Sequence, residues 1–391
     1  MKLVPFLPFP PSVKLSPVKI TDLRTPCVLV DHERVERNID RMQSAVDAHG
    51  VRLRPHSKTH KSPDLARVQL GRGAVGLCCA KLGEAEIFAD AGIPDIRLPY
   101  PLNPANADRV LRLLDRTHLS FIVDHADVAR GWSDALTAAG REVDVLVKVD
   151  VGFHRCGIDP EAPGAADFVV RVAELPGLRF RGLLSHAGHA YAAASDSETA
   201  SFAKAEAEVL NTLAAQVVDR GVTVPEISVG ATPTARFSVQ QPGITELRPG
   251  NYIYFDRTQV ALGSASWDDC ALTVLARVVG RPAPDRVILD CGSKTLSTDQ
   301  TRGLPGNAGY GTVFKSLDEP TPDESLTIER LSEEHATVRV SNGHCRLAPG
   351  DLVRVLPNHA CVVSNLVDCV WLVSGTEVVD QLEVAARGRI A

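Results

Sequence analysis

The feature that most constrains the fold is an alternation of apolar strand-like runs with helix-compatible segments in the middle of the chain. Counted from residue 52, eight such runs recur. They are residues 52–57, 74–80, 95–100, 119–124, 143–150, 179–187, 225–231 and 244–251. Alternating strands and helices predict parallel strands joined by crossover helices. Eight such units over roughly 200 residues have the size of a (β/α)8 TIM-type barrel.

The segments on either side of this region have a different character. Residues 26–31 form one further apolar run, which we interpret as an extra strand or as the lead-in to the barrel. After about residue 263 the chain is β-rich with turn residues between the runs, which predicts a mainly antiparallel β domain. The predicted parts are an N-terminal arm at 1–24 that is a candidate extra strand of the β domain, a barrel at 25–262 and the β domain at 263–391.

Composition excludes several classes of protein. A formal charge of −6 gives no indication of nucleic-acid binding. No apolar run approaches the roughly 20 residues of a membrane helix, and the proline-rich N-terminus does not resemble a signal peptide. The nine cysteines are an odd number without framework spacing, which indicates a reducing compartment. We therefore expect a cytoplasmic protein whose partner is neither nucleic acid nor a membrane.

A basic strand face leads to Lys58, the residue we expect to be chemically reactive. Side chains alternate faces on a strand, so Arg52, Arg54, His56 and Lys58 share one face. A face with so much positive charge requires water, an anion or a substrate. Neighbouring cations depress the pKa of a lysine amine, which favours a Schiff base at Lys58.

Other lysines are weaker candidates for that role. Lys61 and Lys81 fall within or at the start of predicted helices, and Lys148 lies mid-strand, where we expect an ion pair with Asp150. A solvated lysine at a strand end is the alternative interpretation of Lys58 itself.

The loops after strands seven and eight contain the residues of an anion site. In (β/α)8 barrels the backbone N–H groups of these loops converge on a phosphate. Gly230, Thr232 and Thr234 in one loop, with Gly250 and Asn251 in the other, fit this role. A helix N-cap in the first loop is the alternative, and the two roles can share the same N–H groups. A lysine at strand one and a phosphate site at strands seven and eight together indicate pyridoxal phosphate.

Further polar and aromatic residues follow the other strands. Arg155 follows strand five, and His186 and His189 follow strand six. Either histidine is a candidate catalytic residue or a structural one, and Arg155 could simply bind the carbonyls of its own loop. Tyr191 and Tyr252 are candidate cofactor contacts or core aromatics.

A possible metal site lies near the C-terminus. His359 and Cys361 are two residues apart, so on an extended segment both side chains point the same way. Two ligands alone hold zinc poorly, but they leave coordination positions for water and substrate. His344 and Cys345 are adjacent and would point to opposite faces of a strand, so they do not readily chelate.

Six ordered motifs resemble the D-threonine aldolase and D-serine dehydratase group of alanine-racemase-like (fold-type III) pyridoxal phosphate enzymes. They are PHSKTHK, VDVGFHRCGI, HAGHAY, SVGATPT, ELRPGNY and PNHAC, and the resemblance runs from about residue 25 to residue 389. It implies a barrel followed by a β domain, a divalent metal and usually a homodimer. It also implies that Lys58 is the Schiff-base lysine, that Arg155 lies near the pyridine nitrogen, and that His359 and Cys361 are the metal ligands. His56 is a candidate cofactor contact, and the alternative is that it only supports Lys58 through hydrogen bonds.

The last motif also divides the group. Aldolases resemble His-x-Asp at this position and dehydratases resemble His-x-Cys, which is what this chain has at His359 and Cys361. A thiolate favours zinc, whereas a carboxylate better suits manganese or magnesium. The resemblance therefore predicts dehydration and deamination of a D-β-hydroxy amino acid, such as D-serine or D-threonine, to a 2-oxo acid and ammonia.

Three other activities remain open at this point. A D-threonine aldolase-type cleavage would give glycine and an aldehyde, with His186 or His189 as the base. Racemisation at Cα would need an acid on the opposite face and no metal. A non-catalytic carrier would hold pyridoxal phosphate on Lys58 without turnover.

Overall fold

The computed structural model describes residues 18–299 and 308–391, which form two compact units. The barrel unit contains residues 42–58, 65–250 and 388–391. The β unit contains the described residues up to 41, residues 59–64, and those from 251 to 387. The sequence suggested a barrel at 25–262, whereas residues 25–41, 59–64 and 251–262 group with the β unit and residues 388–391 group with the barrel unit.

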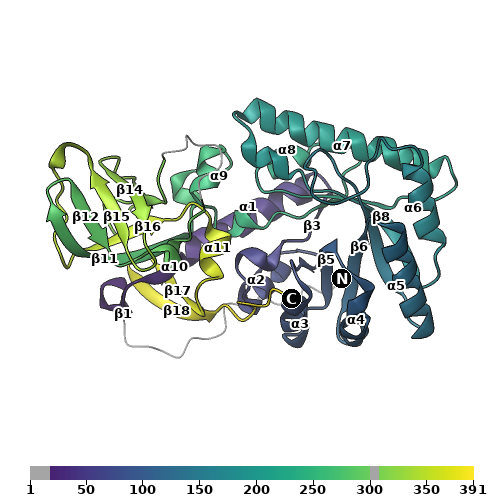
Figure 1. The fold of residues 1–391 in the computed structure, drawn as a ribbon, viewed down its shortest axis with the longest axis horizontal. Helices are drawn as coiled ribbons and strands as arrows, with labels where there is room; N and C mark the ends of the chain where they lie inside the picture. The colour runs from purple at the N-terminus through teal and green to yellow at the C-terminus, as the bar shows by residue number, and fades with distance from the viewer. Residues whose placement is uncertain (1–17, 300–307) are drawn as a thin grey trace. The chain divides into compact units, whose positions relative to one another are not determined.

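The barrel unit contains eight parallel strands, as the sequence predicts (Figure 1). They are β3 (Arg52–Leu53), β4 (Leu77–Cys78), β5 (Asp95–Pro101), β6 (His118–Val123), β7 (Val143–Lys148), β8 (Leu178–Leu184), β9 (Glu226–Val229) and β10 (Glu246–Leu247). Their spatial order is β3-β10-β9-β8-β7-β6-β5-β4. A bridge between His56 and Cys78, with the Cys78 N–H donating to the Pro55 carbonyl at 2.8 Å, joins β3 to β4. The barrel is therefore closed.

Helices connect successive strands and cover the outside of the barrel (Figure 1). They are α2 (Pro63–Gly71), α3 (Leu82–Asp90), α4 (Ala107–Leu114), α5 (Ala126–Ala138), α6 (Ala165–Glu174), α7 (Asp196–Val218) and α8 (Ala235–Ser238). Short 3-10 turns η3 (Pro104–Asn106) and η4 (Gly188–Ala192) lie in the loops. The helix inner faces are apolar; Trp132 of α5, for example, is fully buried and its indole donates to the Leu102 carbonyl at 2.7 Å.

One glycine is required where β8 passes β9. Gly182 has φ +147° and lies at an irregularity in the pairing of β8 with β7. A Cβ at this position would lie 1.8 Å from the carbonyl oxygen of Glu226. Only glycine permits this close approach, so the register that brings Glu226 into the barrel depends on it.

The β unit is mainly antiparallel, as predicted. Its strands are β1 (Val18–Lys19), β2 (Cys27–Asp31), β11 (Leu272–Ala283), β12 (Arg286–Leu289), β13 (Thr312–Val313), β14 (Leu326–Leu331), β15 (Ala336–Val340), β16 (Leu352–Leu356), β17 (Cys369–Ser374) and β18 (Glu377–Glu383). The main path runs β1-β18-β17-β2-β11-β12-β15-β14. Ile20, Leu29, Leu275 and Val373 form part of its core.

Short helices complete this unit. They are α9 (Arg257–Ala261), α10 (Ser293–Leu296), α11 (Ala360–Ser364), and the 3-10 turns η1 (Ile20–Asp22), η5 (Asn251–Ile253), η6 (Trp267–Asp269) and η7 (Ser341–Gly343). The longer helix α1 (His32–Ala48) begins in the β unit and ends in the barrel unit. None of the helices in residues 18–299 and 308–391 combines the length and the apolarity needed to cross a bilayer.

The N-terminal segments lie in the β sheet. The run at 26–31 becomes β2, which pairs with β11 and with β17, so it is an extra strand of the β unit. Residues 18 and 19 of the arm pair with β18, as expected of a strand added to the β domain. The remainder of the arm lies outside the described residues.

Candidate active site

Lys58 lies in a short 3-10 turn, η2 (Ser57–Thr59), at the carboxyl end of β3. The Ser57 hydroxyl donates to the Cys78 carbonyl at 2.9 Å, which fixes the start of this turn to the next strand. The Lys58 side chain is exposed. The carboxyl end of a barrel strand is where catalytic groups of this fold lie, so the position agrees with the expected reactive amine.

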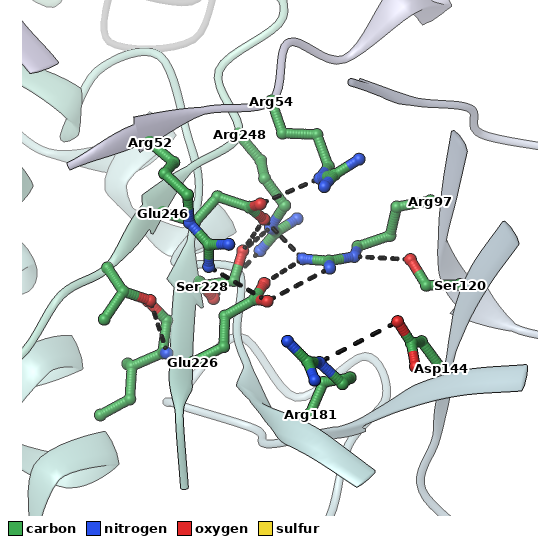
Figure 2. Close-up of polar contacts among 12 residues, drawn as sticks. Arg52, Arg54, Arg97, Ser120, Asp144, Arg181, Glu226, Ser228, Glu246 and Arg248 are labelled. Carbon is green, nitrogen blue, oxygen red and sulfur yellow. Dashed lines mark hydrogen bonds and ion pairs between the residues drawn. The ribbon is translucent and has the colours of Figure 1, made fainter. Parts of the chain in front are cut away.

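The basic strand face before Lys58 is neutralised by the protein itself. Arg52 pairs with Glu226 at 3.2 Å, and Arg54 pairs with Glu246 at 2.9 Å (Figure 2). Arg54 also pairs with Asp95. The expectation that this face requires water, an anion or a substrate is therefore wrong for Arg52 and Arg54. Their partners come from strands far away in the sequence, which a local pattern does not reveal.

A buried polar network continues from this face through the barrel interior (Figure 2). Glu246 Oε1 accepts from Arg97 at 2.5 Å and from the Ser228 hydroxyl at 2.7 Å. Ser228 in turn accepts from Arg248 Nε at 2.8 Å. Burial alone would raise the pKa of Glu246, but the charges of Arg97 and Arg54 hold it well below its usual range.

Arg248 is a buried arginine that the sequence interpretation did not single out. Its guanidinium also donates to the Ser185 carbonyl, and it directly precedes Pro249 and Gly250 of the predicted phosphate loop. Burial lowers its pKa. The sequence did contain one indication that Arg248 lies with Glu246. The two residues are two positions apart, and side chains at this spacing point to the same face of β10 and its extension.

His186 lies at the end of β8 and its ring contacts the next loop. Its Nδ1–H donates to the carbonyl oxygen of Gly230. Burial, together with the nearby charges of Lys148 and Lys58, lowers the pKa of His186 well below its usual value. The ring is therefore neutral, with an unprotonated Nε2. His186 thus contacts the loop after β9 and is affected by the charge of Lys58 at the end of β3, so groups that follow different strands act on one another at the carboxyl end of the barrel.

Lys148 does not form the expected ion pair with Asp150. The Asp150 carboxylate instead accepts from the N–H groups of Gly152 and His154, each at 3.0 Å. Lys148 is buried, and burial, with the charge of Arg248, lowers the pKa of its amine to about 7. As the last residue of β7, its side chain enters the barrel interior, whereas Asp150 lies beyond the strand and binds its own loop.

The loop after β9 has the properties of an anion site. The hydroxyl of Thr232 is buried and has no hydrogen-bond partner within the described part of the chain. A Cβ on Gly230 would lie 3.0 Å from the Arg248 backbone oxygen, so the strand end is closely packed. A buried hydroxyl without a partner is costly unless a ligand completes its hydrogen bond. This loop therefore fits the phosphate of pyridoxal phosphate.

The remaining candidates in the barrel unit differ in burial. His189 lies in η4 with a buried Nδ1 that has no partner among the described residues, and its ring packs edge-on against Phe202 at 4.6 Å. Burial lowers its pKa. Tyr191 lies in the same turn and is half-buried. Arg155 is exposed, with its guanidinium 5.1 Å from the ring centre of Phe153.

His359 and Cys361 come together, but not on an extended segment as expected. His359 is the N-cap of α11, with φ −142° and ψ 97°, and Cys361 lies in the first turn of that helix. The backbone is extended at His359 and helical at Cys361, and the two side chains hydrogen-bond to each other. Asp299 Oδ2 lies 2.7 Å from His359 Nδ1, which leaves Nε2 as the nitrogen for a metal.

The donor set at this pair suits a metal with two protein ligands. Within the described residues, no group of three or more His, Cys, Asp and Glu side chains is arranged to hold a metal. An imidazole nitrogen with a carboxylate on its other nitrogen, beside a cysteine sulfur, matches zinc chemistry. Two protein ligands would leave positions for water and substrate.

Asn251 and Tyr252 both lie in η5 of the β unit. The Asn251 amide donates to Asp256 Oδ2 at 2.6 Å and to the Cys361 sulfur at 3.5 Å, contacts that the sequence did not indicate. Tyr252 is fully buried. Gly250, one residue earlier, is the last residue of the barrel unit in this part of the chain.

Comparison with known proteins identifies the family. Residues 30–258, more than half of the chain, match the family model "Alanine racemase, N-terminal domain", and residues 271–373 match "Putative serine dehydratase domain". This chain belongs to the alanine-racemase-like family. It is 35% identical to a D-threonine aldolase from an Arthrobacter species, over 97% of this chain and 96% of that protein. It is 36% identical to D-threo-3-hydroxyaspartate dehydratase from Delftia sp. strain HT23, over 87% and 91% of the two chains.

A solved structure of a Cys-to-Ala variant of D-threo-3-hydroxyaspartate dehydratase, in the metal-free form, has a TM-score of 0.87 and 29% identity. That match covers 94% of this chain and 98% of the other. These relatives place the chain in the D-threonine aldolase and D-serine dehydratase group, and the resemblance of its motifs is confirmed. This member of the alanine-racemase-like family is a pyridoxal phosphate-dependent lyase that acts on D-amino acids.

Proposed function

We propose that this lyase dehydrates and deaminates a D-β-hydroxy amino acid, such as D-serine or D-threonine, to a 2-oxo acid and ammonia. The observation that carries the proposal is the contact between His359 and Cys361, with Asp299 on the far nitrogen of the imidazole. Nitrogen and sulfur ligands favour zinc over manganese or magnesium. A Cys-to-Ala variant of the dehydratase relative is described in a metal-free form, which supports metal binding in this group.

The barrel unit would hold the cofactor. Lys58 would bind pyridoxal phosphate covalently, and the loops containing Gly230, Thr232 and Gly250 would hold the phosphate. When bound, the cofactor supplies an electron sink that acidifies the substrate Cα proton. We further assign supporting contacts to His56, Arg155, Tyr191, Asn251 and Tyr252, with Arg155 nearest the ring nitrogen.

The reaction needs a base at Cα and a way for hydroxide to leave Cβ. The Lys58 amine would serve as the general base for the substrate Cα proton. His359 and Cys361 would hold a zinc ion, whose chemistry when bound is Lewis acidity that helps a hydroxide leave. The neutral rings of His186 and His189 would accept or return protons near the substrate.

Product identity tests the proposal. The purified protein is incubated with D-serine, D-threonine and D-threo-3-hydroxyaspartate, with and without EDTA, and the products are identified. A 2-oxo acid and ammonia in equal amounts, lost on chelation and restored by zinc, are expected. Glycine with an aldehyde, or turnover that EDTA leaves unchanged, contradicts the proposal.

Aldol cleavage to glycine and an aldehyde is the second candidate. The alignment of almost the whole chain with a D-threonine aldolase favours it. His186 or His189 would then take the β-hydroxyl proton while the Cα–Cβ bond breaks. The same product assay separates the two reactions.

Three further properties belong to the proposal. Reduction with borohydride should leave a pyridoxyl label on the peptide containing Lys58, and a label elsewhere would contradict the assigned lysine. We also propose a homodimer, which sedimentation would test, and a cytoplasmic enzyme whose small-molecule partner is a D-β-hydroxy amino acid.

A further inference from the structure

The sulfur of Cys361 is contacted by donors from two distant parts of the chain. The Thr59 hydroxyl lies 3.2 Å from the sulfur, and the Asn251 amide donates to it at 3.5 Å. All three residues belong to the β unit. A metal-bound cysteine sulfur can only accept hydrogen bonds, so both groups would donate to it.

Asp256 holds one of these donors in place. Its Oδ2 accepts from the Asn251 amide at 2.6 Å and from the Ala360 N–H at 2.9 Å, and its Oδ1 accepts from the Gln259 N–H at 3.1 Å. The Asp256 side chain is fully buried. One carboxylate thus fixes both a donor to the sulfur and the peptide unit between His359 and Cys361.

Thr59, the other donor, is held by α11 and the residue after it. The Ser364 hydroxyl donates to the Thr59 carbonyl at 2.5 Å, and the Lys61 amine donates to Asn365 at 2.6 Å. These bonds fix the backbone on which the Thr59 hydroxyl is presented. Because Thr59 directly follows Lys58 in η2, one short turn contains the cofactor lysine and a group that contacts a metal ligand.

We propose that Thr59 and Asn251 are positioning residues that aim the Cys361 sulfur at a divalent metal, with Asp256 holding Asn251. This rests on the proposed metal site. Asp299 has the corresponding role for the His359 ring. Hydrogen bonds to metal ligands fix ligand orientation, and their loss typically weakens metal binding by about 10–100-fold.

The test compares isosteric variants by metal affinity rather than by activity. Thr59→Val removes the hydroxyl and keeps the shape, and Asn251→Leu removes the amide. Each should weaken zinc binding, measured by competition with a chromophoric chelator, by about 10–100-fold. Thr59→Ser keeps the hydroxyl, so it should bind zinc more tightly than Thr59→Val and close to the affinity of the unaltered protein. The sulfur-to-metal charge-transfer band of the cobalt-loaded protein should shift in both weakened variants.

The matched control is Thr273→Val. Thr273 is a buried threonine of the same unit, and its hydroxyl accepts from Arg354 Nε at 3.1 Å. It should leave zinc affinity unchanged. The absorbance of cofactor bound at Lys58 should be unchanged in Thr59→Val, which excludes a displaced lysine as the cause.

The inference is overturned if Thr59→Val and Asn251→Leu, or the one of them that folds, bind zinc as tightly as the unaltered protein. It is also overturned if Thr273→Val loses as much zinc affinity as they do. Cys361→Ser separates this from failure of the proposed function. If Cys361→Ser binds zinc as tightly as the unaltered protein, the metal site itself is wrong. If it loses zinc while Thr59→Val and Asn251→Leu do not, the metal site stands and only the positioning roles fail.

Discussion

The carboxylate of Glu246 accepts a 2.5 Å hydrogen bond from Arg97, and both side chains are buried inside the barrel. Its second oxygen accepts from Arg54 at 2.9 Å. One buried acid therefore contacts two buried cations (Figure 2). Leaving a buried charge without its partner costs much more folding free energy than breaking an ion pair at the surface. The stability of the barrel unit therefore depends on Glu246.

Replacing Glu246 by leucine should strongly destabilise the protein. Arg54 and Arg97 would keep their other carboxylates but lose the one they share. We expect the free energy of unfolding to fall by about 3–5 kcal/mol, measured by urea denaturation followed by circular dichroism. Asp167→Asn is the control, because the Asp167–Arg220 pair is exposed and should contribute at most about 1 kcal/mol. Equal effects of the two substitutions would contradict the prediction.

The surroundings of His118 predict that the free energy of unfolding depends on pH. Its ring lies 3.0 Å from Asp144 and 3.2 Å from Asp95, and hydrogen bonds to these carboxylates raise its pKa to about 9 from 6.5. The folded state therefore binds the proton more tightly. The resulting stabilisation is fully present below pH 6.5, and it is lost as the pH rises towards about 9.

His118→Gln should therefore lower the urea midpoint at about pH 6 and have little effect at about pH 10. The ring is half exposed, so solvent screening keeps the effect small. His49→Gln is the control, because the exposed His49 ring hydrogen-bonds to a neutral backbone carbonyl, that of Ala45, rather than to a carboxylate. A His118→Gln effect of the same size at both pH values would show that the ion pairs do not stabilise the fold.

The barrel could be predicted from the sequence because its signal is local. Each strand is a short apolar run, and the helices between them have ordinary lengths, so the alternation alone gives the fold and places Lys58 and His186 at strand ends. The β2 strand could not be assigned in the same way. Its run resembles a barrel strand, and only its pairing with β11 and β17 decides the unit to which it belongs.

The charged interior could not be predicted for a similar reason. Arg54 precedes its partner Glu246 by 192 residues, so the sequence shows a basic face without the acids that neutralise it. Likewise, a spacing of two suggested an extended backbone at His359 and Cys361, whereas the chain enters α11 there. Thr59 carried no signal at all, because its role depends on a contact with a residue 302 positions away.

Thr232→Val should weaken binding of pyridoxal phosphate. The buried hydroxyl lacks a partner within the described residues, and a charge-assisted hydrogen bond to phosphate would contribute about 1.5–3 kcal/mol, or roughly a 10–100-fold change in affinity. Titration of the apoprotein with the cofactor, followed by absorbance, measures it. Thr199→Val is the control, because that buried hydroxyl already donates to the Ser195 carbonyl at 3.0 Å. Unchanged affinity in Thr232→Val would exclude this hydroxyl from the phosphate site.

Cys361→Asp should change which metal the enzyme prefers. A carboxylate is a harder ligand than a thiolate, so the His-x-Asp pair should lose zinc affinity and gain relative affinity for manganese. Metal-depleted protein is titrated with each ion, and the affinity ratio is compared with that of the unaltered enzyme. Cys345→Asp is the control, because Cys345 also has a neighbouring histidine but its sulfur accepts from the Leu347 N–H at 3.3 Å. A ratio that shifts equally in both variants, or in neither, would mean that Cys361 does not select the metal.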